Sequence, residues 1–135
     1  MGLAERRAMK EFQDKQFPEL KNEIQKVAGF KVPIEIAWEQ LAVEERTDYY
    51  KEAWTEIFFK PVIDALRQIT RDDMGKEALK DGLKKIEFRN SSGNSSPQRA
   101  ITFINGTIMI DHELTNVGDT ADRTKHLIEL VEKGL

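Results

Sequence analysis

The chain has 135 residues, of which 39% are hydrophobic and 33% charged, with 8 glycines and 4 prolines. This composition excludes a disordered, collagen-like or low-complexity chain, and the length suits one domain (residues 1–135) with its own core. The net charge of −3 lacks the basic surplus typical of nucleic-acid-binding proteins, and the absence of cysteine excludes disulfides and thiolate metal sites.

The first residues run directly into charged side chains, without the apolar segment of a secretory signal. No apolar run approaches the roughly 20 residues that cross a bilayer. We therefore expect a cytoplasmic protein that binds neither membranes nor nucleic acids.

The first part of the chain changes from a helical to a strand-like pattern. Residues 3–28 have helical spacing, and Pro18 is expected either to kink this helix near Phe17 or to begin a new one, because proline clashes inside a helix but suits its first turn. Residues 31–38 alternate with a period of two and predict a strand. Pro33 places that strand at a sheet edge, because proline has no N–H to donate to a neighbouring strand.

The longest predicted helix covers residues 45–69, with a second kink expected at Pro61. A further helix at 73–84 begins after Asp72, which is a good N-cap residue. Further strands are predicted at 85–90, 99–104 and 107–112, and a final helix at 120–133.

The last two strands are joined by Asn105-Gly106, the pair favoured in type I′ hairpin turns. Strands that follow one another through short connections usually pair with opposite directions. The sequence therefore predicts an α+β fold, with a single mostly antiparallel sheet of about four strands packed against helices.

The helix at 45–69 carries two apolar stripes, so it is either central in the fold or shared with a partner chain. Trp54 belongs to the first stripe, and Phe59, Ile63 and Leu66 mark the second. Large aromatic side chains are enriched at protein interfaces. The leading hypothesis is a non-catalytic protein-interaction domain that uses this surface, with a protein partner or a second copy in a homodimer.

The alternative hypothesis is a small enzyme or ligand-binding protein. His112 follows a strand within Asp111-His112-Glu113, and a neutral imidazole is a common general base. Neighbouring strand residues point to opposite sides, so the three cannot converge as a triad. No cofactor or metal ion is expected, because no phosphate-binding loop, calcium loop or zinc-helix motif is present.

The segment from Asn90 to Arg99 is rich in serine, asparagine and glycine, with Arg89 and Arg99 at its two ends. Hydroxyl groups and arginines together suit an anion, and Lys84 and Lys85 lie just before them. Serine, asparagine and glycine are also what ordinary connecting loops use, so a solvated loop is the favoured explanation of the segment.

Overall fold

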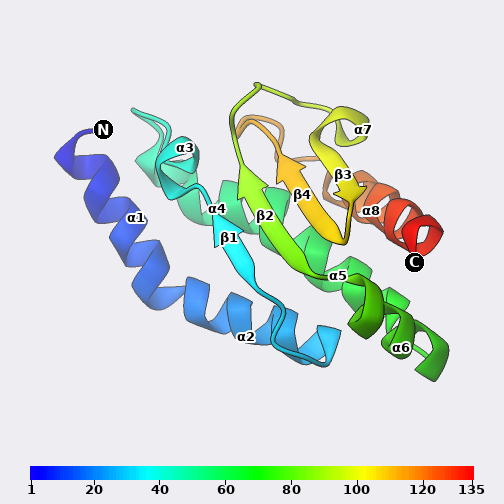
Figure 1. Ribbon diagram of the computed structural model, residues 1–135. Coiled ribbons are helices and arrows are strands. Elements are labelled where there is room, and N and C mark those ends of the chain that lie inside the picture. Colours follow the sequence, from blue (N-terminus) through cyan, green and yellow to red (C-terminus); the bar gives the residue numbers. More distant parts are fainter.

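Two layers make up the structure, which is a computed structural model of all residues from Met1 to Leu135. A four-stranded sheet lies in front, and the long helices lie behind it (Figure 1). The strands are β1 (Ile34–Ile36), β2 (Lys85–Arg89), β3 (Ile101–Ile104) and β4 (Thr107–Asp111). The helices are α1 (Leu3–Lys15), α2 (Phe17–Ala28), α3 (Trp38–Leu41), α4 (Tyr50–Trp54), α5 (Lys60–Ile69), α6 (Asp73–Gly82), α7 (Pro97–Ala100) and α8 (Thr120–Gly134).

The sheet is mixed, with the strand order β1-β2-β4-β3. β1 and β2 are parallel, β2 and β4 are parallel, and only β3 and β4 are antiparallel. The α+β class is confirmed, but the prediction of a mostly antiparallel sheet was wrong. The connection over residues 90–100 includes α7 and carries the chain past the position that β4 later fills, so β2 and β3 never pair.

Proline and glycine divide the chain largely as their chemistry predicts. The first predicted helix is interrupted at Gln16, and Pro18 occupies the first turn of α2. β1 lies at a sheet edge, as Pro33 indicated. Asn105 and Gly106 both have positive φ angles, 52° and 76°, which confirms the predicted hairpin turn.

The long predicted helix is interrupted rather than uniform. It consists of a 3-10 turn (Thr47–Tyr49), α4, a π-helical turn (Thr55–Phe59) and α5. In the π-helical turn the N–H of Lys60 donates to the carbonyl of Thr55, five residues back. Pro61 follows immediately and has no N–H, so the change of hydrogen-bonding pattern occurs where the helix loses a donor.

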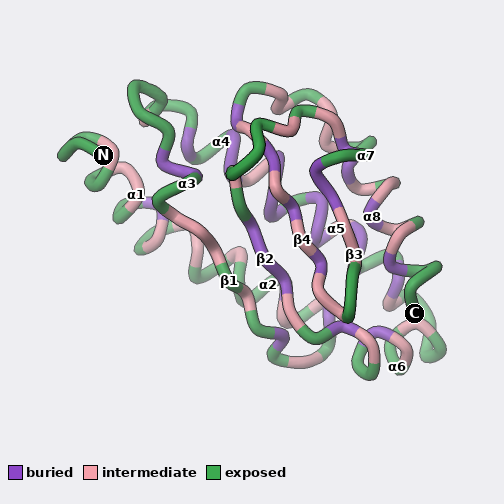
Figure 2. The backbone as a smooth tube through the Cα atoms, turned by 45° about the horizontal axis from the view of Figure 1, so that its top comes forward, coloured by how far each residue is buried: buried purple, intermediate pink, exposed green.

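The core lies between the sheet and the helices. Ile86 and Phe88 of β2, with Ile108 and Ile110 of β4, point toward the helices and are fully buried. They belong to one cluster of 28 buried hydrophobic residues. The purple segments of Figure 2 follow this layer, whereas exposed segments dominate the loops and the chain ends. None of the helices combines the length and the apolar character that a bilayer crossing requires.

Candidate functional site

The aromatic cluster of the long helix lies inside the core. Trp54, Phe59 and Leu66 are fully buried, and Ile63 is 5% exposed. The Trp54 ring stacks on Tyr50 with centroids 4.5 Å apart, and its Nε1 donates to the carbonyl of Leu41. α5 contacts both α2 and α8, which accounts for the two apolar stripes. The predicted partner surface on these four residues is therefore wrong, because their own chain already covers them.

His112 is also buried, at the end of β4. Its Nδ1 lies 2.5 Å from the carbonyl oxygen of Glu113, and its Nε2 has no hydrogen-bond partner. Burial lowers the pKa of His112, and the positive charge of Arg123 lowers it further. None of the five main surface hollows is lined by His112. A ligand therefore has no visible route to this imidazole.

Arg123 is the most unusual buried residue, because its side chain is fully enclosed at the first turns of α8. Its guanidinium donates to the carbonyls of Asn116 at 3.0 Å, Val117 at 3.3 Å and Glu56 at 3.3 Å. Burial lowers the pKa of this guanidinium. Arg123 thus ties the loop after β4 to the π-helical turn, which is a structural role.

The π-helical turn explains why the Glu56 carbonyl needs such a partner. Continuing the five-residue pattern, this carbonyl would accept from the N–H of residue 61, but Pro61 has none. Thr120 Oγ1 donates to it at 3.2 Å, and Arg123 adds the second bond. The sequence contained a signal that Arg123 faces the core: it lies four residues before Leu127 and eight before Val131, which are both buried on the same side of the helix.

The segment from Asn90 to Arg99 is bound to the rest of the chain. The backbone N–H of Ser91 donates to Asp111 at 2.7 Å, and Asn94 Nδ2 donates to the Asp111 carbonyl at 3.1 Å. Asn116 Nδ2 donates to the carbonyl of Ser95 at 2.8 Å. No hydrogen bond or ion pair joins Arg89 or Arg99 to the hydroxyl groups of this segment. The loop is thus an ordered connection, in which Asp111 accepts from both the backbone N–H and the hydroxyl group of Ser91.

Arg89 instead belongs to a cluster on the side of the sheet that faces away from the helices. Lys85 Nζ lies 2.5 Å from Glu87 Oε1 and 3.4 Å from Glu35 Oε2. Arg89 Nη2 lies 2.7 Å from Glu87 Oε2. The two groups form an ion pair, but their relative orientation does not meet the geometry of a hydrogen bond. Glu87 is only 5% exposed between its two cations, although no helix covers this side.

The two cations control the charge of Glu87. The Lys85 hydrogen bond, assisted by the Arg89 charge, lowers the pKa of Glu87 against the opposing effect of burial. The Glu87 carboxylate in turn raises the pKa of Lys85. Glu87 and Lys85 therefore stay ionised near neutral pH, and the Glu87 carboxylate holds both neighbouring cations in position.

We call this side of the sheet the open sheet face. The strand register places the following residues on it: Glu35, Lys85, Glu87, Arg89, Thr102, Ile104, Thr107, Met109 and Asp111. Charged side chains lie mainly on β1 and β2, whereas Met109 and Ile104 add apolar area on β4 and β3. The prediction overlooked this face, although Lys85, Glu87 and Arg89 alternate with the buried Ile86 and Phe88.

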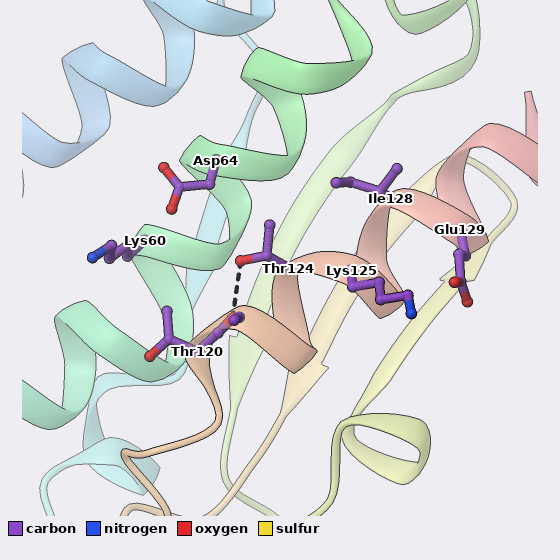
Figure 3. A pocket seen from close by; sticks show the side chains of 8 residues that line it. Lys60, Asp64, Thr120, Thr124, Lys125, Ile128 and Glu129 are labelled. Carbon is purple, nitrogen blue, oxygen red and sulfur yellow. Dashed lines mark hydrogen bonds between the residues drawn. The ribbon is translucent and has the colours of Figure 1, made fainter.

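The largest of the five main hollows lies in the helix layer, between α5 and α8, and has a volume of about 640 Å³. Figure 3 shows its lining side chains, which are Lys60, Asp64, Thr120, Ala121, Thr124, Lys125, Ile128 and Glu129. Two cations and two anions leave it with no charge preference, and only two of the eight residues are apolar. Small-molecule sites are lined mainly by apolar side chains, so this hollow is a poor candidate.

No group of three or more histidine, aspartate and glutamate side chains is arranged to hold a metal ion. The open sheet face is thus the most distinctive surface that the fold leaves uncovered. Comparisons with protein-family models, curated proteins and solved structures found no match to this chain.

Proposed function

We propose that this protein is a non-catalytic protein-interaction domain whose contact surface is the open sheet face. One observation carries the proposal: the long helices lie on one side of the sheet (Figure 1), and the other side presents an ordered ion cluster next to apolar side chains. The enzyme hypothesis based on His112 receives no such support, because that side chain is fully buried and lines none of the five main hollows.

The chemistry of the face favours a protein partner. Its charges are mixed, with Glu35, Glu87 and Asp111 against Lys85 and Arg89, so a polyanion finds no basic surplus there. Met109 lies beside Glu87 in the strand register and offers a flexible apolar contact. The face thus combines charged groups on β1 and β2 with apolar area on β4 and β3, and protein interfaces likewise combine polar and apolar area.

The ion cluster also lowers the cost of binding. Lys85 and Arg89 are already held by Glu87, so fewer rotamers are lost when a partner arrives. The exposed Glu35 and the outer part of Arg89 then present fixed charges of opposite sign. Such an arrangement selects a partner by charge complementarity.

Site-specific photo-crosslinking in living cells tests this proposal. A photoreactive amino acid at Thr107, on the open sheet face, is expected to give a discrete protein adduct. The same amino acid at Lys125, on the outer side of α8, is the matched control and is expected to give none. A second substitution, Met109→Lys, replaces an apolar contact of the face with a charge and should abolish the Thr107 adduct. The chain should stay folded, because the added ammonium lies beside the Glu87 carboxylate. Adducts from Lys125 alone, or none from either position, would overturn the proposal.

A further inference from the structure

The outer edge of β3 has hydrogen-bonding groups that no other strand uses. β3 is the last strand in the order β1-β2-β4-β3. Ile104 lies opposite Thr107 across the two-residue turn, so Ile104 and Thr102 bond to β4 and the alternate residues face outward. The Ile101 N–H already donates to the Pro97 carbonyl. The Phe103 N–H and carbonyl therefore remain as a donor and acceptor pair at the open edge.

The side chains of this edge lack the features that normally prevent strands from pairing. Residues 100–107 contain no charged residue and no proline. Ile104 is 62% exposed on the open sheet face. The Phe103 ring points toward α8, where a Cβ atom on Gly134 would lie 2.5 Å from it, so the ring does not cover the edge. Natural proteins usually protect exposed edge strands with charges, proline or bulges.

The opposite edge of the sheet is protected. Pro33, which has no N–H to donate to another strand, directly precedes β1. Lys31 and Glu35 add charges on either side of that proline, and both are exposed. Each chain therefore offers one edge that is suited to pairing and one that is not.

We propose that β3 pairs antiparallel with β3 of a second copy of this chain, around a two-fold axis. A two-fold axis places the strand against itself, so one uncharged sequence satisfies both sides without unpaired charges. Because the β1 edge is blocked, the assembly closes at two chains and does not extend into a fibre. The two sheets become one continuous eight-stranded sheet, and the two open sheet faces lie side by side. This inference concerns the edge and goes beyond the proposed function of the face.

Sedimentation velocity over a wide concentration range, with two exposed positions compared, tests the pairing. The wild type is expected to reach twice the monomer mass of 15.6 kDa. Ile104→Lys places a charge at the paired edge and is expected to weaken the dimer by about tenfold or more, about 1.4 kcal/mol. Met74→Lys is the matched control, because Met74 is 81% exposed on α6, and it should leave the dimer unchanged.

Single-cysteine variants give an independent readout, since the chain has no cysteine of its own. An equimolar mixture of Thr102→Cys and Ile104→Cys chains is expected to form a disulfide-linked dimer on mild oxidation, because pairing through Phe103 places Thr102 of one chain opposite Ile104 of the other, whereas Met74→Cys should stay monomeric on a denaturing gel. A wild type that stays monomeric throughout, or open-ended oligomers, would overturn the proposal. So would a dimer that resists Ile104→Lys and does not crosslink between Thr102 and Ile104, because a different surface would then be in contact. Met109→Lys should leave the dimer intact, which separates this result from a failure of the open sheet face.

Discussion

The stability of the protein is expected to fall in mildly acidic solution because of His112. The imidazole is fully buried, and its Nε2 has no hydrogen-bond partner. A protonated imidazole would also be repelled by the positive charge of Arg123 on α8. Glu113 and Asp119 also face it and favour protonation, but burial dominates and the pKa of His112 is lowered from 6.5. Above pH 6.5 the imidazole is neutral in both the folded and the unfolded state, so it adds no pH dependence there.

Below pH 6.5 the unfolded chain takes up a proton at His112 and the folded chain does not, so unfolding becomes easier as the pH falls. One pKa unit corresponds to about 1.4 kcal/mol, so up to that amount is expected to be lost between pH 6.5 and 5.5. Loss continues until the pH falls below the pKa of the folded state. Glu113 affects stability at lower pH. Its pKa is lowered from 4.5 in the folded chain, so its contribution to the free energy of unfolding is present above pH 4.5 and is lost as the pH falls below that value.

Urea unfolding at pH 7.5, 6.5 and 5.5 measures this effect, with His112→Phe as the comparison. The phenylalanine keeps an aromatic ring and removes the titration, so the difference in slope between the two proteins isolates His112. Any constant loss of stability in the variant cancels in that difference. Equal slopes for the two proteins between pH 6.5 and 5.5 would show that the buried imidazole is not held neutral.

Four further substitutions test the packing. Arg123→Met removes three hydrogen bonds to backbone carbonyls and is expected to cost about 2–4 kcal/mol in urea unfolding. Hydrogen exchange in residues 113–119 should accelerate with it, and unchanged exchange there would contradict the role given to this arginine. Gly75→Ala places a Cβ 1.8 Å from a backbone oxygen and is expected to cost about 1–3 kcal/mol in thermal unfolding. Gly118→Ala, where nothing lies within 4 Å, should cost less than about 0.5 kcal/mol, and equal losses at the two glycines would refute the steric argument. Ile63→Ala should cost about 2–5 kcal/mol in urea unfolding. Light scattering should give the same molecular mass for the Ile63→Ala variant as for the wild type. A changed mass without a loss of stability would instead indicate that Ile63 lies in an interface between chains.

Local chemistry made the boundaries of many elements predictable. The Asp72 carboxylate accepts from the Gly75 N–H at 2.8 Å, as an N-cap residue should. Asn105 and Gly106 adopt the positive φ angles of their turn, and Pro33 precedes an edge strand. Each of these features depends on residues close together in the chain, so the sequence pattern contains the necessary information.

The parts that failed depend on contacts between distant residues. An apolar stripe shows that Ile63 and Leu66 avoid water, but not whether α2 and α8 of the same chain or another protein covers them. Strand order has the same limitation, because alternation gives the buried side of a strand and not its neighbour. The open sheet face was missed for a related reason: charged residues on a strand mark its uncovered side only once the helices are placed.

The carbonyl of Glu56 joins two parts of the sequence that are far apart. Its partner in the helix is missing because residue 61 is a proline, and Arg123 and Thr120 replace that partner from 64 or more residues away. The fitness effects of positions 61 and 123 should therefore depend on each other. A chain with alanine at position 61 can restore a local donor, and the loss of Arg123 should then be better tolerated. In evolution, the order in which these two residues changed would have been constrained, since the loss of Arg123 while residue 61 is a proline takes a donor from the Glu56 carbonyl that the helix cannot replace.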